Sequence, residues 1–287
     1  MAGTRYQVNW PWREELPDLP ENRGLAKGRL KSLVNKLEKH PELMKRYDAI
    51  FQDQLRNGMI EKVERTQNDG FKHYLPHHVV ITPAKATTKL KIVYNASAKT
   101  RKEHKSLNEC LKSGPVLLHN LCGILMRFRL HKIGMVSDKE KAFLQTGSQP
   151  SQRDVTRFLW LKDCETPIVD ETHIQEYRFC RVPFGVVSSP FLLGVECHLD
   201  IYKTKWAKQL MENIYMDNVI TGVDSVNEAV DMYKSAKCIF NEGKMNLREW
   251  MTNSDDVRSA KPNDDRSVGD TTKVLGHLWT ARMTRLL

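Results

Sequence analysis

Two aspartates stand at positions where a chain could present carboxylates to divalent cations. Asp138 ends the strand-like run Met135-Val136-Ser137, and Asp217 lies between the short apolar runs Ile214-Tyr215 and Val219-Ile220. Enzymes that build nucleic acid by phosphoryl transfer use carboxylates on adjacent elements to hold two divalent cations about 4 Å apart. If the strand end and the hairpin turn face one another, the two aspartates predict such a site. A lone aspartate at a strand end or turn is more often only a turn former.

The residues around both aspartates resemble one enzyme family. Tyr215-Met216-Asp217-Asn218 resembles the Tyr-x-Asp-Asp box of reverse transcriptases, and residues 137–145 resemble the upstream catalytic motif of BEL/Pao-type retrotransposons, usually Asp-Ile-Glu-Lys-Ala-Phe-Leu-Gln. Further resemblances to that family follow in the same order along the chain, at residues 5–8, 11–12, 74–78, 88–98, 106–108, 127–129, 177–179, 182–186, 188–191 and 221–226. The chain therefore resembles the reverse transcriptase domain of a BEL/Pao-type LTR retrotransposon polyprotein.

This resemblance implies an α+β fold of reverse-transcriptase fingers and palm subdomains. A mixed or antiparallel palm sheet would be covered by helices on one face, and the thumb would be absent. The implied activity is that of an RNA-directed DNA polymerase, a nucleotidyltransferase that works with two metal ions. The cofactor would be Mg²⁺, with Mn²⁺ as a possible substitute. The partners would be an RNA or DNA template with its primer, and deoxynucleoside triphosphates.

Carried over by position, the resemblance assigns catalytic roles to Asp138, Asp217 and Asn218, with the two aspartates as metal ligands. Lys139 would contribute its backbone carbonyl to the same site. Phe143 falls where the family keeps an aromatic ring against the sugar of the incoming nucleotide, so it would exclude a 2′-hydroxyl by steric contact. The competing interpretation of Phe143 is a core aromatic residue.

Basic residues of the fingers hairpin would contact the nucleotide phosphates. Lys89 and Lys91 correspond to family residues that stabilise charge on the leaving pyrophosphate, and Lys85 is a weaker candidate in the same loop. Lysines on a hairpin also protect exposed strand edges, and that interpretation stays open. Phe184 and Gly185 resemble the segment that lines the nucleotide and template pocket, where glycine permits close backbone approach.

The last apolar run, residues 273–279, contains Leu275-Gly276-His277. These residues resemble the primer-grip hairpin that seats the growing 3′ end. The sequence stops just beyond them, so the resemblance covers no thumb, RNase H or integrase segment. Without a thumb, affinity for nucleic acid would depend on phosphate contacts by Lys and Arg and would fall steeply with salt.

Three substitutions depart from the family's pattern. Asn218 replaces the second carboxylate of the Tyr-x-Asp-Asp box, and its amide brings no negative charge to a site that would hold two divalent cations. Asn95 stands where aspartate is usual, in the strand that carries Lys91. Lys139 places a cation beside Asp138, where isoleucine is usual, and would compete with Mg²⁺. We therefore expect impaired catalysis.

The composition favours a globular protein, and its charge leaves two interpretations open, a protein that binds polyanions or a merely soluble basic protein. Lys and Arg total 45 against 35 Asp and Glu, a net charge of +10, and such a surface attracts nucleic acid. The 6 cysteines form no Cys-x-x-Cys pair, which argues against a zinc site or a disulfide framework and favours reduced thiols. No stretch approaches the roughly 18 apolar residues of a membrane span, and no apolar leader opens the chain, so we expect a cytoplasmic or nuclear protein.

Periodicity predicts the elements that must position these residues. Apolar residues at helical spacing predict helices over residues 26–37, 41–55, 191–206 and 226–240. Runs of β-branched residues predict strands over 79–82, 90–94, 135–137, 155–161, 177–182, 214–215 and 219–220. The first two strands form a predicted hairpin with a basic tip, and the last two form a tight hairpin around Met216-Asp217-Asn218.

The polar stretch 252–272 lacks periodicity, which predicts a loop or mobile linker. Its acidic pairs, Asp255-Asp256 and Asp264-Asp265, are expected in solvent rather than on a metal.

The motif order predicts six segments. They are residues 1–105, an N-terminal helical lead and fingers hairpin; 106–145, a first part of the palm; 146–182, a return to the fingers; 183–251, the palm core; 252–272, the polar linker; and 273–287, a primer-grip-like end.

Other chemistry finds less support. His73, His77 and His78 could suggest a metal cluster, but no acidic or cysteine partner stands with them, and the family has a structural lead into the fingers here. No Gly-x-Ser-x-Gly elbow supports hydrolase chemistry. The alternatives to reverse transcription are a catalytically inactive nucleic-acid-binding remnant or domesticated module, and a structural partner subunit for an intact polymerase.

Overall fold

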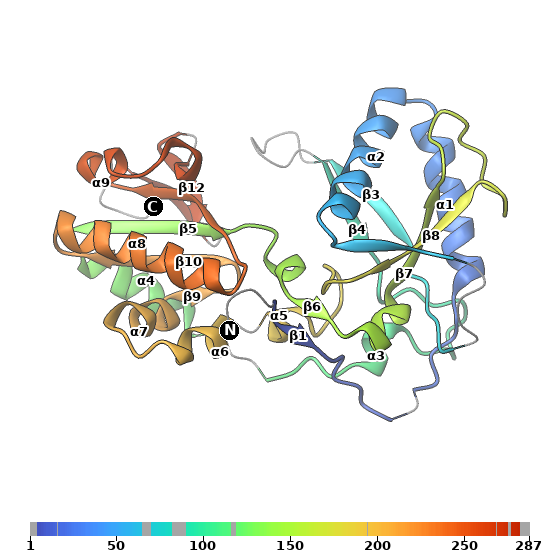
Figure 1. Cartoon of the computed structure of the whole chain (residues 1–287), viewed down its shortest axis with the longest axis horizontal. Helices are drawn as coiled ribbons and strands as arrows, with labels where there is room; N and C mark the ends of the chain where they lie inside the picture. The colour runs from blue at the N-terminus through green and yellow to red at the C-terminus, as the bar shows by residue number, and fades with distance from the viewer. Residues whose placement is uncertain are drawn as a thin grey trace. The chain divides into compact units, whose positions relative to one another are not determined.

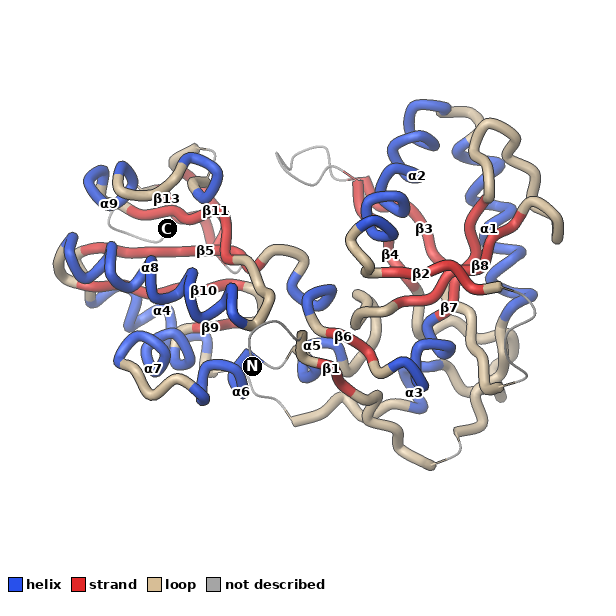
Figure 2. Tube along the Cα trace, viewed as in Figure 1, coloured by secondary structure: helices blue, strands red, loops and turns tan. Residues whose placement is uncertain are grey.

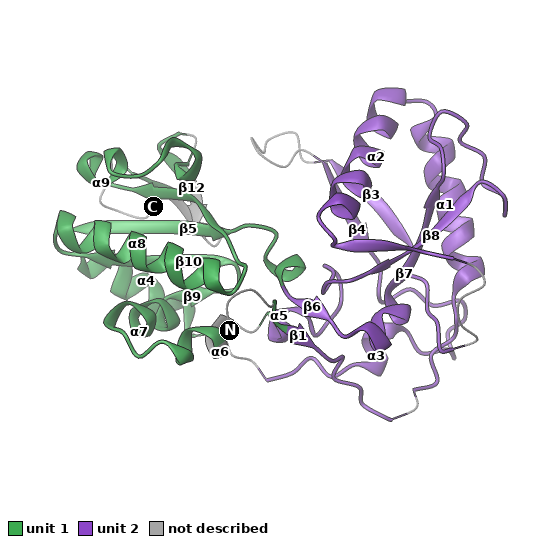
Figure 3. Cartoon of the chain, viewed as in Figure 1, with its two compact units in different colours: residues 1–6, 116–145, 193–287 green, residues 7–115, 146–192 purple. Residues whose placement is uncertain are grey.

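The computed structural model describes residues 5–15, 17–64, 70–81, 90–115, 119–193, 195–267, 269–274 and 277–281. The chain divides into two compact units (Figure 3). Unit 1 comprises residues 1–6, 116–145 and 193–287, and unit 2 comprises residues 7–115 and 146–192. Neither unit is continuous in the sequence, so each is assembled from segments that lie far apart along the chain.

Unit 1 is built on a four-stranded antiparallel sheet with strand order β11-β5-β10-β9 (Figures 1 and 2). The strands are β5 (Ile133–Lys139), β9 (Ile214–Tyr215), β10 (Asn218–Val223) and β11 (Leu247–Thr252). β5 is central and pairs with β10 on one side and β11 on the other. The sequence predicted β5, β9 and β10 but not β11.

Alternate residues of β5 belong to two apolar cores. Met135 lies in the core covered by α7 (Lys205–Glu212) and α8 (Val226–Glu242). Val136 lies in a second core with Phe128 of α4 (Leu121–Leu130) and Trp279 of β13 (His277–Thr280). Helices therefore cover both faces of this sheet, and the expectation of helices on one face is wrong. The physical reason is that the sheet is apolar on both faces, and each face must be buried.

The predicted helix over 226–240 is confirmed as α8. Ser225 caps it, because its Oγ accepts a hydrogen bond from the Glu228 N–H at 3.3 Å. Of the residues whose spacing predicted the helix, Tyr233 and Phe240 are buried, whereas Val226 and Val230 are only partly buried. The buried residues are Ala229, Met232, Tyr233, Ala236, Ile239 and Phe240.

The single helix predicted over 191–206 is wrong. The structure has α5 (Ser189–Leu192), α6 (Val195–Ile201) and α7 instead. Thr204 ends the apparent period, because its Oγ1 accepts a hydrogen bond from the Ala207 N–H at 3.1 Å and starts a new helix. Trp206 keeps its apolar role, but as a residue of α7.

The stretch 252–272, predicted as a polar linker, is folded over most of its length. It contains α9 (Asp255–Ser259), the 3₁₀ turn η3 (Asn263–Asp265) and the start of β12 (Thr271–Val274), which pairs with β13. Asp265 is not solvated as expected, since it accepts hydrogen bonds from the hydroxyl of Tyr233 and, at 2.8 Å, from Lys237 Nζ. Polar partners hold this segment, so no apolar period marks it.

Unit 2 contains a three-stranded antiparallel sheet of order β2-β8-β7 and a separate hairpin, β3-β4. Its strands are β2 (Ile60–Val63), β3 (His77–Ile81), β4 (Leu90–Tyr94), β7 (Arg157–Leu161) and β8 (Ile174–Phe179). The helices α1 (Arg23–Leu37) and α2 (Pro41–Arg56) pack on these strands. Both helices and the hairpin strands are confirmed, while the predicted basic tip of the hairpin lies outside the described residues.

Short elements complete the units, and the sequence predicted none of them. In unit 2, β1 (Gln7–Val8) pairs in parallel with β6 (Gly147–Ser148), followed by the 3₁₀ helix η2 (Pro150–Thr156), and α3 (Leu107–Cys110) is a single turn. In unit 1, the 3₁₀ helix η1 (Ala142–Gln145) follows β5. None of the described helices combines the length and apolar character needed to cross a bilayer.

His77 is a structural residue of unit 2 rather than a metal ligand. Its Nε2 donates to the carbonyl of Leu159 at 2.8 Å, and its Nδ1 accepts from the hydroxyl of Tyr47 at 2.6 Å. Burial lowers the pKa of His77 to about 4, so the ring is neutral. Both ring nitrogens are therefore used within the fold.

A chain of buried ion pairs joins three elements of unit 2. The side chain of Glu176, 6% exposed, lies 3.3 Å from Arg157 Nη1 and 3.1 Å from Arg23 Nε, and it accepts a hydrogen bond from the hydroxyl of Tyr74. Glu171, on the other side of Arg23, is 46% exposed. Loss of the negative charge of Glu176 should be costly, because Arg157 is buried with it and would keep Asp154 but lose its second carboxylate partner.

We expect Glu176→Gln to lower the free energy of unfolding by about 3 kcal/mol, the cost of breaking a buried ion pair on one side. The matched variant Glu171→Gln loses a solvent-exposed partner of the same arginine and should cost less than about 1 kcal/mol. Urea unfolding of both variants measures the difference. If both variants lost the same free energy of unfolding, burial would not be the reason that the Glu176 ion pairs stabilise the fold.

Candidate active site

The pairing of β5 with β10 brings the two predicted aspartates together in unit 1. Asp138 is directly opposite Asn218 in the antiparallel register, and the Lys139 N–H donates to the carbonyl oxygen of Asp217 at 2.7 Å. The sequence placed residue 218 in the turn, but it is the first residue of β10. A turn residue and a strand residue thus present their carboxylates at one end of the sheet.

A two-residue turn sets the position of Asp217. β9 and β10 pair Tyr215 with Asn218, so only Met216 and Asp217 lie in the loop. Met216 has a φ of 59°, and two-residue hairpin loops favour a positive φ because their twist then matches that of the strands. The strained residue is therefore the neighbour of the aspartate, not the aspartate itself.

Excess negative charge gathers at Asp138. Burial and, after it, the negative charges of Asp217 and Glu249 together raise its pKa to about 6. Arg248 opposes them, with its Nε 3.7 Å from Asp138 Oδ2. A bound cation would relieve this repulsion, and carboxylate oxygens are the ligands that hard divalent cations take. The donor set therefore fits Mg²⁺.

Two carboxylates are fewer than most metal sites use. Within the ranges that the structure describes, no group of three or more His, Cys, Asp or Glu side chains is arranged to hold a metal ion. Asn218 stands where a further carboxylate would extend the set, and its Nδ2 donates to Asp217 Oδ1 at 2.8 Å. The amide thus occupies one oxygen of a predicted metal ligand and adds no negative charge.

Arg248 and Glu249 of β11 are residues of this site that the sequence analysis missed. Arg248 pairs in register with Asp138, and the register shifts between Arg248 and Met251, which marks a bulge. Glu249, in that bulge, has a φ of 54°. The guanidinium of Arg248 also lies 3.3 Å from Glu140. No local sequence pattern predicts β11. Only its pairing with β5 shows that the charges of Arg248 and Glu249 lie at this site.

Lys139 does not stand beside Asp138 as expected. Successive side chains of a strand point to opposite faces, and Lys139 is only 3% exposed. Burial lowers the pKa of its ammonium to about 7, against which the charge of Asp217 acts weakly. The lowered pKa weakens the positive charge of this lysine at neutral pH, and the expected competition with Mg²⁺ stays a prediction. The role of its backbone carbonyl stays a prediction.

Phe143, in η1, is partly buried and packs against the apolar core of unit 1. This contact fits the core-aromatic interpretation, and the role as sugar selector stays a prediction. In unit 2, Lys91 is exposed on β4 and Phe184 is 41% exposed in the loop after β8. Gly185 has a φ of 96°, and a Cβ there would lie 2.3 Å from the Tyr94 carbonyl oxygen. Close backbone approach at this glycine is thus a property of the fold.

Several predicted site residues lie outside the described residues. These are Lys85 and Lys89 of the hairpin tip, and Leu275 and Gly276 of the primer-grip-like end. His277 begins β13, opposite Val274. The nucleotide and primer roles of all five residues stay predictions.

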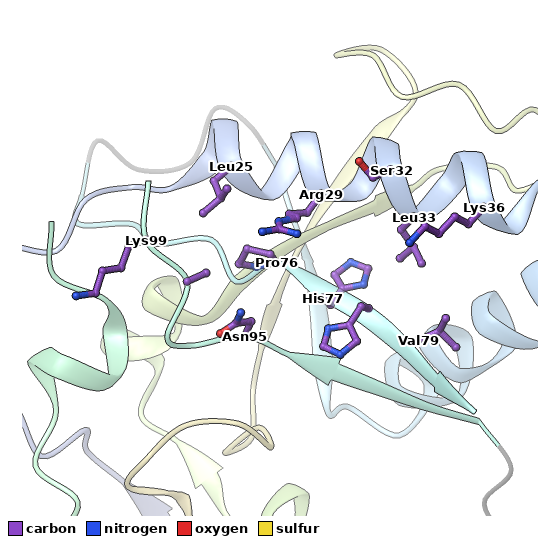
Figure 4. A pocket seen from close by; sticks show the side chains of 12 residues that line it. Leu25, Arg29, Ser32, Leu33, Lys36, Pro76, His77, Val79, Asn95 and Lys99 are labelled. Atoms are coloured by element: carbon purple, nitrogen blue, oxygen red, sulfur yellow. The ribbon is translucent and has the colours of Figure 1, made fainter. Parts of the chain in front are cut away.

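Unit 2 also has a basic groove between α1 and β3, of about 480 Å³ (Figure 4). Its charged side chains are all basic, and they are Arg29, Lys36 and Lys99. Leu25, Leu33, Pro76 and Val79 provide apolar surface between them. Positive charge along a groove attracts the phosphates of nucleic acid.

Comparison with known proteins bears on the fold. No protein-family model matches the sequence, and neither does any curated protein. Among solved structures, the foamy viral protease-reverse transcriptase in complex with RNA/DNA hybrid matches at 16% identity and a TM-score of 0.56, over 84% of this chain and 26% of that chain. The foamy viral protease-reverse transcriptase in complex with dsDNA matches at 14% identity and a TM-score of 0.58, over 98% of this chain and 47% of that chain.

These neighbours establish the fold class. The chain has a mixed α and β structure with antiparallel sheets and a reverse transcriptase-like fold. It spans less than half of the length of either neighbour.

The pKa of Asp138 predicts a stability cost at neutral pH. Because the folded state raises this pKa from 3.8 to about 6, folding favours the protonated form, and stability is lost as the pH rises from about 4 to about 6. In metal-free buffer at pH 7 we expect Asp138→Asn to raise the free energy of unfolding by about 1–2 kcal/mol, a value reduced for solvent screening of a side chain that is partly exposed. The gain should disappear below about pH 4.

Thermal unfolding between pH 3.5 and 8 measures this dependence. Asp200→Asn is the control, since Asp200 lies in the same unit with its side chain 69% exposed, and it should change stability little at any pH. A gain for Asp138→Asn that persists unchanged at pH 3.5 would refute the charge argument.

Proposed function

We propose that this chain is an RNA-directed DNA polymerase domain of a BEL/Pao-type retrotransposon, with impaired catalysis. The observation that carries the proposal is the juxtaposition of Asp138 and Asp217 at one end of an antiparallel sheet, in a chain with a reverse transcriptase-like fold. The ordered motifs around both aspartates support the BEL/Pao assignment. The cytoplasm or the nucleus is the proposed location.

In this proposal Asp138 and Asp217 hold two Mg²⁺ ions. Once bound, the ions activate the 3′-hydroxyl of the primer and stabilise the leaving pyrophosphate. The aspartates must be ionised to bind them, so protons compete with Mg²⁺ for Asp138 and activity should fall in acid. Lys91 contacts the triphosphate of the deoxynucleotide, and Phe143 contacts its sugar.

Nucleic acid is the proposed partner, as a primed RNA or DNA template. The net charge of +10 supports this partner. So does the groove between α1 and β3, whose charged lining is basic throughout. Each lysine or arginine that neutralises a phosphate releases counterions, so binding should weaken as salt rises.

A second candidate function is a catalytically silent nucleic-acid-binding module. The specific observation in its favour is the arrangement around Asp217 and Asp138. The amide of Asn218 donates to Asp217 Oδ1 at 2.8 Å, and the guanidinium of Arg248 lies 3.7 Å from Asp138 Oδ2. Both contacts use carboxylate oxygens that metal ions would need, and neither affects the basic groove.

Primer extension distinguishes the two functions. We expect Asn218→Asp to increase the rate of Mg²⁺-dependent extension about 10- to 100-fold, because the new carboxylate adds negative charge where the cations bind. Asp138→Asn is the matched negative control and should abolish extension in both backgrounds. The assay uses a labelled primer on RNA and on DNA templates, at pH 8, where Asp138 is ionised.

The opposite result would exclude the polymerase. If neither the unmodified chain nor Asn218→Asp extends a primer, while both bind primer-template, the enzymatic proposal fails and the silent module remains.

The basic groove makes a separate prediction about binding. The double variant Arg29→Glu, Lys36→Glu should weaken single-strand binding and reduce the slope of log affinity against log salt by about 2, since about one counterion is released per phosphate contact. The control Lys31→Glu, Arg46→Glu makes the same change in net charge at exposed positions outside this groove. Fluorescence anisotropy at several salt concentrations measures both slopes. Equal slopes for the two variants would show that net charge alone drives binding.

A further inference from the structure

Asn108 is a residue of unit 2 whose side chain joins two segments far apart in the sequence. It is the second residue of the single-turn helix α3. Its Nδ2 donates to Ser97 Oγ at 2.8 Å and to the Gly185 carbonyl oxygen at 3.1 Å, and its Oδ1 accepts from the Val187 N–H at 2.8 Å. One amide group thus uses both its donor and its acceptor to hold the loop after β8.

The three side-chain hydrogen bonds of Asn108, here called the clamp, hold a stretch of backbone that is closely packed. Gly185 passes so close to the end of β4 that a Cβ would meet the carbonyl oxygen of Tyr94 at 2.3 Å. The same loop is anchored at its start, because Ser189 Oγ donates to the Pro183 carbonyl at 2.8 Å. Between these anchors lies Phe184, with 41% of its surface exposed. The loop is therefore held rigidly while one aromatic side chain stays accessible.

Asn108 also connects this loop to β4. Its own N–H donates to the Ala96 carbonyl at 3.0 Å, and Ala96 follows β4 by two residues. β4 carries Lys91, the predicted phosphate contact, and the loop carries Phe184 and Gly185, the predicted lining of the nucleotide and template pocket. The two sets of predicted nucleotide contacts are thus linked through one residue, by its backbone to the end of β4 and by its side chain to the loop.

We propose that Asn108 is a positioning residue for the incoming nucleotide, which fixes the 183–187 loop against the end of β4. It does not touch the nucleotide in this role. It acts through Gly185 and Val187, whose backbone it holds. The inference rests on the proposed polymerase function and names a further residue on which nucleotide binding depends.

The physical effect follows from preorganisation. A loop that is already ordered loses little conformational entropy when a ligand binds, so release of the loop lowers ligand affinity even where no direct contact is lost. Loss of two or three neutral hydrogen bonds corresponds to about a tenfold loss of nucleotide affinity. Affinity for primer-template, which depends on distributed phosphate contacts, should change less than about twofold.

The test combines two measurements on the full chain. Amide hydrogen exchange at Val187 reports the clamp without any need for activity. The affinity of a matching deoxynucleoside triphosphate for the chain on a dideoxy-terminated primer-template, with Mg²⁺, reports the role without any need for catalysis. The variants are Asn108→Ala, Asn108→Asp and the control Asn35→Ala, an exposed asparagine of α1.

In Asn108→Ala we expect faster exchange at Val187 and about a tenfold loss of nucleotide affinity, with primer-template affinity retained. In Asn108→Asp the acceptor for Val187 remains and the donors are lost, so Val187 should stay protected while nucleotide affinity still falls. Asn35→Ala should change neither. If the alanine variant fails to fold, the aspartate variant tests the proposal by itself. Misfolding could not produce its expected result, which is normal protection of the Val187 N–H together with weaker nucleotide binding.

Two results would overturn the proposal. Unchanged exchange at Val187 in Asn108→Ala would show that there is no clamp. Faster exchange with unchanged nucleotide affinity would show that the clamp is only structural. An unmodified chain that binds primer-template but no nucleotide would instead overturn the polymerase proposal, and the nucleotide role of Asn108 with it.

Discussion

The antiparallel register between β5 and β10 is the constraint on which unit 1 depends. It sets Asp138 opposite Asn218 and brings the backbone of Asp217 to the N–H of Lys139. Burial first, and then repulsion from the neighbouring carboxylates of Asp217 and Glu249, raise the pKa of Asp138. The apolar residues on the two faces of the sheet offset that repulsion, because their burial is gained only if the same register forms. The pairing of β5 with β10 therefore stabilises the fold through apolar burial and, at the same time, creates the destabilising cluster of carboxylates at Asp138.

Under the proposed function, the balance of charge around this pair would separate a working metal site from a silent one. Asn218 brings an amide where a carboxylate would bind a cation, and Arg248 brings a positive charge near Asp138. Lys139 contributes less than its formal charge, since burial lowers its pKa to about 7. Of these three, Asn218 would matter most in the proposed polymerase, because it brings no negative charge and its amide also donates to Asp217 Oδ1.

Unit 2 holds exposed side chains on a backbone that is fixed by buried polar contacts. Its interior uses buried polar contacts that are satisfied within the fold, as Glu176 with its arginines and His77 between Tyr47 and Leu159 show. Such contacts are directional, so they fix geometry more closely than apolar packing does. Asn108 applies the same principle at the surface, next to the exposed ring of Phe184.

The sequence by itself determined the elements with strong local signals, such as α1, α2, α8 and the β3-β4 hairpin, and it singled out Asp138 and Asp217 by motif. It failed over 252–272 and at the helix break before Thr204, where caps and ion pairs replace apolar periodicity. Only the tertiary structure decided that Asn218 pairs with Asp138, that Arg248 lies beside them, and that Lys139 is buried. Periodicity and capping act within a few residues, whereas register, burial and pKa depend on partners that are distant in the chain.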